Sequence, residues 1–166
     1  MKAIETTYRG WKFRSRLEAR WAVFFDALRI AWEYEPEGFE FADGERYLPD
    51  FFLPGFCIGG IYVEVKPFEQ AFEKAHKFSR EGKKSILLAH GTPSWGAYTF
   101  LKHTGDELID CSAAFKSKYL PGGINAREYR LYISPETCDP NHYAVNHAIV
   151  AARSARFEFG ELERGL

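Results

Sequence analysis

The stretch YLPDFFL, residues 47–53, has the pattern of a buried strand but contains two residues that buried strands rarely hold. Its aromatic and aliphatic side chains predict a strand half buried in a hydrophobic core. Pro49 cannot donate a hydrogen bond to a neighbouring strand, so the strand should lie at a sheet edge or bend at this point. A buried and unpaired Asp50 carboxylate would cost several kcal/mol of stability. By itself the stretch is therefore either a turn between two apolar pieces or part of a functional site.

Hydrophobic periodicity predicts a helix, three strands, a second helix and a fourth strand up to residue 90. The first helix, residues 15–30, has apolar side chains at helical spacing and Ser15 in the position of an N-cap. The second helix, residues 68–81, is amphipathic and stops at Gly82. The strands are WEYEPEGFEF (32–41) and ERYLPDFFLP (45–54), joined by an Asp43-Gly44 turn, then IYVEVKP (61–67) and KSILLAHG (84–91).

The rest of the chain predicts a β-rich extension that ends in a helix. An alanine-rich segment, residues 141–157, has the pattern of this closing helix. The fold class is therefore α/β with a mixed sheet, and the length fits one domain over residues 1–166. We expect a core over residues 10–90 and an extension over residues 91–166 packed on that core. The strands of the extension are AYTFLKH (97–103), ELIDCSAAF (107–115) and REYRLYI (127–133), separated by a Thr104-Gly105-Asp106 turn and a Pro121-Gly122-Gly123 loop.

Composition and charge exclude several classes of protein. Hydrophobic residues make up 46% of the chain, which indicates a folded globular protein and not a disordered segment. The net charge of −1 excludes a histone-like polycation but allows a local basic patch that meets nucleic acid. The three cysteines lie far apart without C-x-x-C spacing, so we expect neither a disulfide framework nor an ordinary zinc motif. No apolar run is long enough to span a bilayer, and a cytoplasmic protein is predicted.

The strand IYVEVKP places a carboxylate and an ammonium group side by side. Side chains alternate along a strand, so Glu64 and Lys66 share one face, roughly 7 Å apart. A surface ion pair would explain them without any function. If the preceding strand is the antiparallel neighbour, however, Asp50 faces Glu64 across the ladder and two carboxylates converge beside Lys66. Like charges this close repel each other unless a cation lies between them, and paired carboxylates suit Mg²⁺ or Mn²⁺.

Two carboxylates, a divalent metal and a lysine together suit phosphodiester hydrolysis. The metal lowers the pKa of water and neutralises charge in the transition state, while Lys66 would orient the attacking water or stabilise negative charge. Glu18 is a third acid, and it has two explanations. In a capping box formed by S-R-L-E, residues 15–18, Glu18 would reach back to Ser15. Alternatively the first helix offers Glu18 to the same metal, and beside the other two acids we favour this second explanation.

This combination of residues resembles the PD-(D/E)XK nucleases, whose core is the restriction-endonuclease-like fold. The match consists of Pro49-Asp50, Glu64-Val65-Lys66 and a preceding helix that bears Glu18, and it covers about residues 10–90. The chain is similar in particular to small stand-alone members from phage and bacterial genomes, which implies a phage-infected or bacterial cell. The resemblance implies that Asp50, Glu64, Glu18 and the carbonyl group of Val65 bind Mg²⁺ or Mn²⁺, and that Lys66 assists catalysis.

Several basic residues are candidates for contacts with nucleic acid. Arg14, Arg16 and Arg20 could bind phosphates at the mouth of the site or be ordinary surface charge. In some relatives the helix after the motif touches DNA; otherwise its polar residues are simply solvated. On this helix the candidates are Gln70, Lys74 and Lys77, and further along the chain the candidates to clamp a strand are Lys116, Lys118, Arg127, Arg130, Arg153 and Arg156.

The predicted function is a metal-dependent nuclease, a DNA endonuclease that acts on duplex or branched DNA in preference to RNA. The alternative is a non-catalytic nucleic-acid-binding module on the same fold, but such a copy would usually lack one of the acids or the lysine. The sequence indicates no separate recognition domain, so a long target site would need a homodimer. Tyr34 and Glu35, which lie near these residues, are expected to be structural.

Overall fold

A central mixed sheet of seven strands organises the part of the chain that the structure, a computed structural model, describes. This part comprises residues 4–56, 59–68, 72–94, 98–103, 108–119, 127–133 and 143–157, with the backbone alone for 111, 112, 114–119, 127–133, 143 and 144. In spatial order the strands are β11 (Arg127–Ile133), β10 (Leu108–Tyr119), β9 (Tyr98–His103), β8 (Ile86–His90), β7 (Ile61–Lys66), β6 (Phe51–Leu53) and β3 (Glu33–Tyr34). Neighbouring strands are antiparallel except β7 and β8, which are parallel. The predicted α/β class with a mixed sheet is confirmed.

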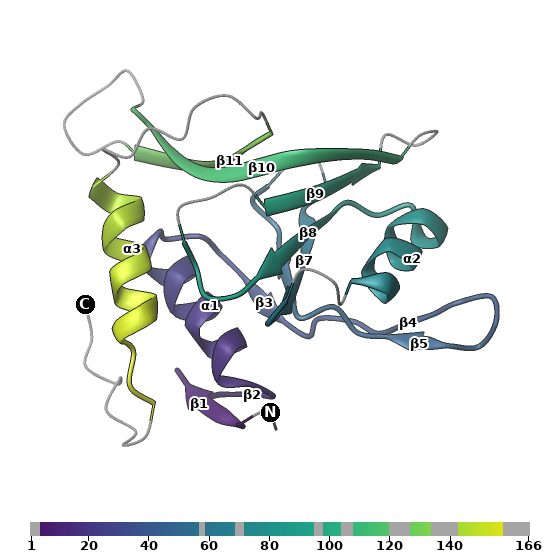
Figure 1. Cartoon of the computed structure of the whole chain (residues 1–166), viewed down its shortest axis with the longest axis horizontal. Coiled ribbons are helices and arrows are strands. Elements are labelled where there is room, and N and C mark those ends of the chain that lie inside the picture. The colour runs from purple at the N-terminus through teal and green to yellow at the C-terminus, as the bar shows by residue number, and fades with distance from the viewer. Residues whose placement is uncertain are drawn as a thin grey trace.

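Helices cover both faces of this sheet (Figure 1). α1 (Arg16–Ala27) and α3 (Tyr143–Ser154) lie side by side on one face, and α2 (Glu73–Gly82) lies on the other. The core beneath α1 and α3 includes Trp21, Phe25, Val63, Val65, Leu87 and Ala148. The core beneath α2 includes Tyr62, Phe78, Ile86, Leu88 and Leu101. Among the described residues, no helix has the length and apolar character that crossing a membrane requires.

The start of α1 follows from its capping residue. Ser15 has extended backbone angles, and its Oγ accepts a hydrogen bond from the N–H group of Glu18 at 3.1 Å. This contact satisfies one of the free N–H groups of the first turn, as the sequence predicts. Further along the helix, the Nε1 atom of Trp21 donates to the carbonyl oxygen of Gly91 at 2.9 Å. α1 is thereby fixed against the end of β8, which holds its first turn over the sheet.

Two of the predicted strands are each broken in two, which corrects the sequence analysis. The segment 32–41 contains β3 and β4 (Phe39–Glu40), and the segment 45–54 contains β5 (Arg46–Tyr47) and β6. Prolines lie between the pieces, Pro36 in the first segment and Pro49 in the second, and neither can donate to a ladder. β3, the first piece of its segment, and β6, the last piece of its segment, join the main sheet. β4 and β5 pair with each other as a separate two-stranded ribbon. The predicted turn at Asp43-Gly44 closes this ribbon.

A further hairpin, which the sequence analysis did not predict, precedes α1. β1 (Thr6–Tyr8) and β2 (Trp11–Phe13) are antiparallel and are joined by two residues with positive φ, Arg9 at 48° and Gly10 at 79°. Two consecutive residues of this kind are typical of the tightest hairpin turns, and glycine after a polar residue is the sequence signal for them. The short segments TTY and WKF on either side of Arg9-Gly10 were therefore a sequence signal for this hairpin.

The remaining elements agree in type with the sequence prediction and differ in their bounds. α2 begins at Glu73, five residues after the predicted start at 68, and residues 69–71 are not described. The three strands of the extension are present as β9, β10 and β11, with β10 running to Tyr119. α3 occupies 143–154 of the predicted 141–157. The predicted turn at 104–106 and the loop at 121–123 lie outside the described residues.

Candidate functional site

Acidic side chains meet at the carboxyl-terminal end of β7. β6 pairs antiparallel with β7, with Phe51 opposite Val63, so one further step along this register places Asp50 opposite Glu64. This is the antiparallel pairing that brings the carboxylates of Asp50 and Glu64 together. The chain bends at Asp50, just before β6, so Pro49 lies outside the ladder although β6 itself is an interior strand. The opening stretch is thus both a bend and a part of the acidic cluster.

Both faces of β7 are covered, so Glu64 and Lys66 are not a surface ion pair. Glu64 is only 4% exposed, because α2 and the β4–β5 ribbon cover the face of the sheet on which it lies. Lys66 is the last residue of the strand and keeps a third of its side chain exposed. Their ion pair exists, between Lys66 Nζ and Glu64 Oε1, but it lies in the interior at the edge of solvent. A pair in this position costs desolvation energy that a surface pair does not.

Asp50 is almost completely buried, at 1% exposure, and both of its oxygens accept hydrogen bonds. Its Oδ2 accepts from the backbone N–H group of Val65 at 2.7 Å, and its Oδ1 accepts from the Arg14 guanidinium at 2.8 Å. Arg14 also pairs with Glu35, at 2.5 Å, and so connects the segment before α1 to the site. In an extended strand the N–H and C=O groups of one residue point to the same neighbour. The carbonyl of Val65 therefore faces the side on which Asp50 lies.

Glu64 has a second partner in Tyr47, which the sequence analysis did not single out. The Tyr47 hydroxyl donates to Glu64 Oε2 at 2.7 Å, and both residues are buried. Burial, followed by the negative charge of Glu64, raises the pKa of Tyr47, so this hydroxyl stays protonated and remains a donor. The two residues are far apart in sequence, and only the position of Tyr47 next to the Leu48-Pro49-Asp50 segment gave a signal for its role.

Of the two roles that the sequence left open for Glu18, the structure shows the capping contact, and the role toward a metal stays a prediction. Its Oε1 accepts a hydrogen bond from the Ser15 hydroxyl at 2.7 Å, which completes the capping contact. Its Oε2 accepts from Tyr34 at 2.6 Å, and the residue is 7% exposed. Tyr34 in turn accepts a hydrogen bond from the N–H group of Arg14, at 3.0 Å. Glu18 thus faces inward, one hydrogen-bonded residue away from the segment that holds Asp50, and Tyr34 connects them as a structural residue.

The electrostatics of the cluster are those of acids that repel each other in a dry environment. Burial, and then the charge of Glu64, raise the pKa of Asp50 well above its usual value; Lys66 and the Val65 N–H group oppose this, and Glu18 adds to it. For Lys66, burial lowers the pKa, but the charges of Asp50 and Glu64 outweigh burial and the pKa is raised. Lys66 is therefore an ammonium ion at neutral pH, suited to stabilising negative charge and not to accepting a proton.

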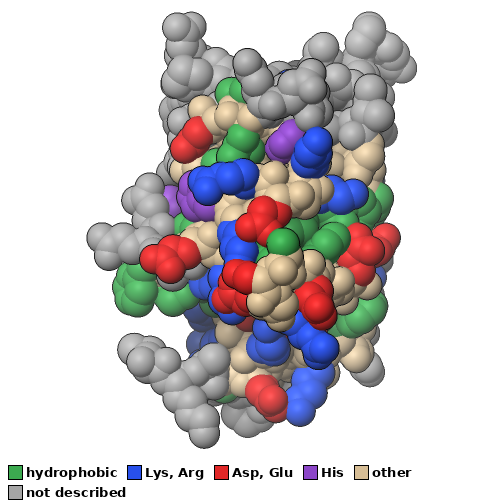
Figure 2. Space-filling view, turned by 90° about the vertical axis from the view of Figure 1, so that its right-hand side faces the viewer, with side chains coloured by type: hydrophobic (Ala, Val, Ile, Leu, Met, Phe, Trp, Pro, Cys, Tyr) green, Lys and Arg blue, Asp and Glu red, His purple; other side chains and the backbone are tan. Residues whose placement is uncertain are grey.

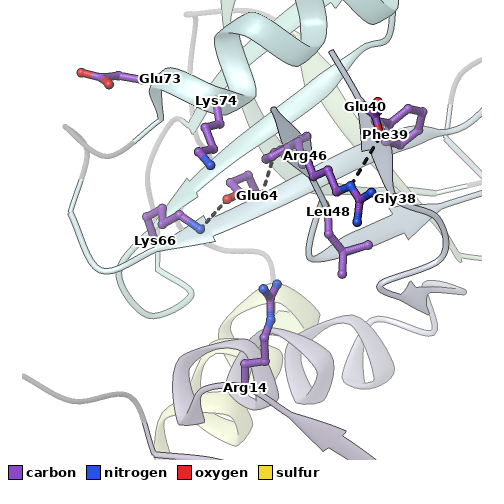
Figure 3. A pocket seen from close by; sticks show the side chains of 11 residues that line it. Arg14, Gly38, Phe39, Glu40, Arg46, Leu48, Glu64, Lys66, Glu73 and Lys74 are labelled. Carbon is purple, nitrogen blue, oxygen red and sulfur yellow. Dashed lines mark hydrogen bonds and ion pairs between the residues drawn. The ribbon is translucent and has the colours of Figure 1, made fainter. Parts of the chain in front are cut away.

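A cavity of about 1000 Å³ opens beside Glu64 and Lys66. The β4–β5 ribbon supplies one wall, through Phe39, Arg46 and the adjoining Leu48, and Lys74 of α2 lies at another side. Figure 3 shows Arg14 reaching into this space from the segment before α1, opposite Glu64, Lys66 and Lys74. The cavity therefore connects Glu64 to solvent, whereas Asp50 and Glu18 do not line it. Four cations line the cavity, Arg14, Arg46, Lys66 and Lys74, together with the acids Glu40, Glu64 and Glu73.

The donor set fits a divalent cation that prefers oxygen ligands. Among the described residues, no three His, Cys, Asp or Glu side chains form a group that could hold a metal ion. Mg²⁺, however, is commonly held by one or two carboxylates, with water and substrate phosphates as its other ligands. Each carboxylate oxygen has two lone pairs, so Asp50 and Glu64 can bind a cation and keep their present hydrogen bonds. Asp50 and Glu64, with the Val65 carbonyl on the same side, could therefore supply the two carboxylates by which Mg²⁺ is commonly held.

The basic residues that the sequence analysis proposed for contacts with nucleic acid lie in different places. Arg14 and Lys74 line the cavity, as proposed for contacts with substrate. Lys77 does not: it bridges Asp43, at 2.5 Å, and Glu45, at 3.1 Å, and so binds the ribbon to α2. On the face that carries the ribbon and α2, the acidic and basic side chains of the described residues are interspersed and form no uniform basic patch (Figure 2).

The remaining basic candidates belong to α1, to β10 and β11, and to α3 and the residues just after it. Arg16 and Arg20 are half-buried on α1 and do not line the cavity. Arg153 donates through Nε to the carbonyl oxygen of Pro93 at 3.2 Å, and Arg156 is exposed. The backbones of Lys116, Lys118, Arg127 and Arg130 lie in β10 and β11, their side chains are not described, and Gln70 lies outside the described residues.

No protein-family model matches this chain, and no curated protein or solved structure matches it either.

Proposed function

We propose that the chain is a metal-dependent nuclease with a restriction-endonuclease-like core, most suited to act as a DNA endonuclease. Apart from the β4–β5 ribbon inserted between β3 and β6, the chain order α1, β3, β6, β7, α2, β8 supports the core, because it repeats the helix, three strands, helix and strand of that fold. The antiparallel run β3, β6, β7 and the parallel pair β7 and β8 support it further. The fold by itself does not determine a reaction, so the proposal depends on the site.

The observation that carries the proposal is the convergence of buried carboxylates beside a charged lysine at the end of β7. Asp50 and Glu64 are each less than 5% exposed and repel each other. A protein interior tolerates such an arrangement poorly unless a cation offsets it, and functional sites are where this cost is commonly found. Structural ion pairs of similar burial usually balance their charges, whereas Arg14 here divides its charge between Asp50 and Glu35.

Asp50, Glu64 and the Val65 carbonyl would hold the metal, with Glu18 as a supporting acid. When bound, a divalent cation supplies Lewis acidity, which makes water a better nucleophile at neutral pH and offsets negative charge on phosphate. Lys66 Nζ places a permanent positive charge at the mouth of the site, where it stabilises the charge that develops on the phosphate oxygens. Tyr47 fixes the orientation of Glu64 by donating to its second oxygen.

The competing proposal, a binding module without catalytic activity, is less consistent with this set. A module that only binds DNA gains from cations and loses from buried acids, since phosphates repel carboxylates. The site retains Asp50, Glu64 and Lys66 together, and all three lie at one end of β7. Loss of Asp50 or Glu64 would have relieved the repulsion between the two acids without harm to simple binding.

The experiment that tests the proposal is incubation of the purified protein with Mg²⁺ or Mn²⁺ and a panel of labelled DNA and RNA substrates. We expect cleavage of DNA that EDTA abolishes and that either metal restores. Cleavage that continues in EDTA would refute the metal-dependent mechanism. Binding of DNA without cleavage under any metal would favour the binding module.

A further inference from the structure

The cavity beside Glu64 has a composition that differs from that of a simple phosphate site. Phe39 and Leu48 are only half-buried, so they offer apolar surface to the space, and Tyr47 adds an aromatic ring. Cations lie around this apolar wall, among them Arg46 and Lys74, and they outnumber the acids Glu40, Glu64 and Glu73 of the lining by one. Apolar and aromatic surface suits a nucleobase, whereas cations suit the phosphates on either side of it.

The apolar wall is a firm part of the molecule. The ribbon packs on α2 through Phe41, Tyr47 and Phe78, with the rings of Tyr47 and Phe78 5.1 Å apart. Two lysines of α2 hold its turn, Lys74 through Glu45 at 2.9 Å and Lys77 through both acids of the turn. The cavity is therefore formed before any ligand arrives, which reduces the entropy cost of binding.

The wall is also directly connected to the acidic cluster. Leu48 lies two residues before Asp50, and the Tyr47 hydroxyl donates a hydrogen bond to Glu64. A base that rests against Leu48 and Phe39 would thus place its own phosphates close to the proposed catalytic groups. Such a base has to leave its helical stack, because a base inside a duplex cannot enter a cavity.

From these observations we infer that the cavity binds one unpaired nucleotide of the substrate strand, and that the protein prefers single-stranded or branched DNA to intact duplex. The inference rests on the proposed function and narrows its substrate class. A paired base would have to be extruded first, at a cost of a few kcal/mol. A single strand, or the strand at a branch, avoids that cost.

The chain offers a matched pair of glycines with which to test the cavity. A Cβ atom at Gly38, which lines the cavity, would find its nearest neighbour in the Tyr47 carbonyl oxygen, at 3.9 Å. A Cβ atom at Gly55, which does not line the cavity, would meet nothing within 4 Å. Neither glycine has a positive φ, so a side chain strains neither backbone. Gly38→Leu should reduce the space, whereas Gly55→Leu serves as the control.

The measurement is the affinity for labelled DNA of one sequence, as a single strand, as a blunt duplex and as a duplex with a single-stranded flap, in EDTA. We expect the wild-type protein and Gly55→Leu to bind the strand and the flap at least about tenfold more tightly than the duplex, the effect of one favourable base contact. Gly38→Leu should lose this preference and keep its duplex affinity. Thermal unfolding of both variants verifies that they are folded, and the wild-type comparison is decisive even if Gly38→Leu does not fold.

Equal affinity of the wild-type protein for strand and duplex would overturn the inference, as would a folded Gly38→Leu variant that keeps the preference. Cleavage assays in Mg²⁺ separate this from the proposed function. Equal cleavage of duplex and flap refutes the inference and leaves the nuclease in place. Preferential binding of the flap without any cleavage refutes the nuclease and leaves the nucleotide site in place.

Discussion

Two clusters of acids and bases lie near each other in this molecule, and they differ in burial. The interior cluster comprises Asp50 and Glu64 with Lys66 and Arg14, and the ribbon cluster comprises Asp43 and Glu45 with Lys74 and Lys77. In the ribbon cluster, hydrogen bonds from lysine lower the pKa of both carboxyl groups. In the interior cluster, burial and a second acid raise the pKa of Asp50 although cations are equally close.

This difference separates exposed ion pairs, which favour the charged carboxyl groups, from a buried site in which burial and a second acid oppose the charge of Asp50. Exposed ion pairs gain little and cost little, so the ribbon cluster needs no purpose beyond holding the ribbon on α2. A buried carboxylate beside another acid lowers stability, and selection keeps it where it serves a reaction or a ligand. A change in the interior cluster should therefore affect the protein differently from the corresponding change in the ribbon cluster or at the helix cap.

The largest effect should follow removal of an acid. Asp50→Ala or Glu64→Ala should abolish cleavage and leave the protein folded, because the change removes a metal ligand and also relieves repulsion. Asp43→Ala, which removes an acid of the ribbon cluster, should leave cleavage unchanged. Rates of DNA cleavage in Mg²⁺ and thermal unfolding together measure this. Normal cleavage by either interior variant would remove the acidic cluster from the mechanism.

The next largest effect should come from the lysines. Lys66→Ala should lower turnover by about a hundredfold, the usual loss when one preorganised charge near the transition state is removed. DNA affinity should change little, since one charge among many phosphate contacts adds little. Lys77→Ala, in the ribbon cluster, should change neither quantity. If Lys66→Ala weakened binding and turnover by the same factor, we would assign it to positioning of the substrate.

A smaller effect is expected from the acid of α1. Glu18→Gln keeps the length of the side chain and one acceptor oxygen, so it can still accept from one of Ser15 and Tyr34 while its amide nitrogen donates to the other hydroxyl, but it removes a charge near the proposed metal. Activity should fall about tenfold, at the lower end for groups that support a metal ligand, and more metal should be required. Ser15→Ala is the control, because it removes the cap at a cost of about 1 kcal/mol without altering the charge. Equal activity of the two variants would leave Glu18 with the role of a cap alone.

The sequence predicts the part of the site that depends on local periodicity and strand order. Alternation along IYVEVKP places Glu64 and Lys66 on one face, and antiparallel pairing then brings Asp50 opposite Glu64, as β6 and β7 show. The cap at Ser15 also follows from local sequence. These features depend on neighbours within a few residues or on adjacent strands.

What the sequence did not predict depends on packing between distant segments. Glu64 is buried because α2 and the ribbon cover it, and no pattern in β7 distinguishes this face from an exposed one. Tyr47 and Arg14 reach the acids from segments 17 and 36 residues away in the chain. The breaks at Pro36 and Pro49 were foreseeable in principle, because proline cannot donate within a strand, but the separate ribbon that results is a tertiary arrangement.

The smallest effect should be on stability and should depend on pH with opposite sign in the two clusters. A carboxyl group whose pKa is raised on folding binds its proton more tightly in the folded protein, so Asp50 lowers stability most above its folded-state pKa, and the loss shrinks as the pH falls below that value toward the unfolded-state pKa. Asp50→Asn should therefore raise the melting temperature at neutral pH, with a smaller gain at mildly acidic pH. Each unit of raised pKa corresponds to about 1.4 kcal/mol, which is roughly 3–6 °C in melting temperature for a protein of this size.

Asp43→Asn should behave in the opposite way, because the pKa of Asp43 is lowered on folding. Its carboxylate contributes stability at neutral pH that is lost as the pH falls through its folded-state pKa, so the variant should be slightly less stable than the wild type only above that range. High salt should remove this difference, since the ion pairs of the ribbon cluster are exposed, and should leave the effect of Asp50→Asn almost unchanged. Melting curves at several pH values, with and without salt, measure both. A fall in melting temperature for both variants at neutral pH would show that Asp50 is a stabilising partner of Arg14, and the contrast between the two clusters would then be wrong.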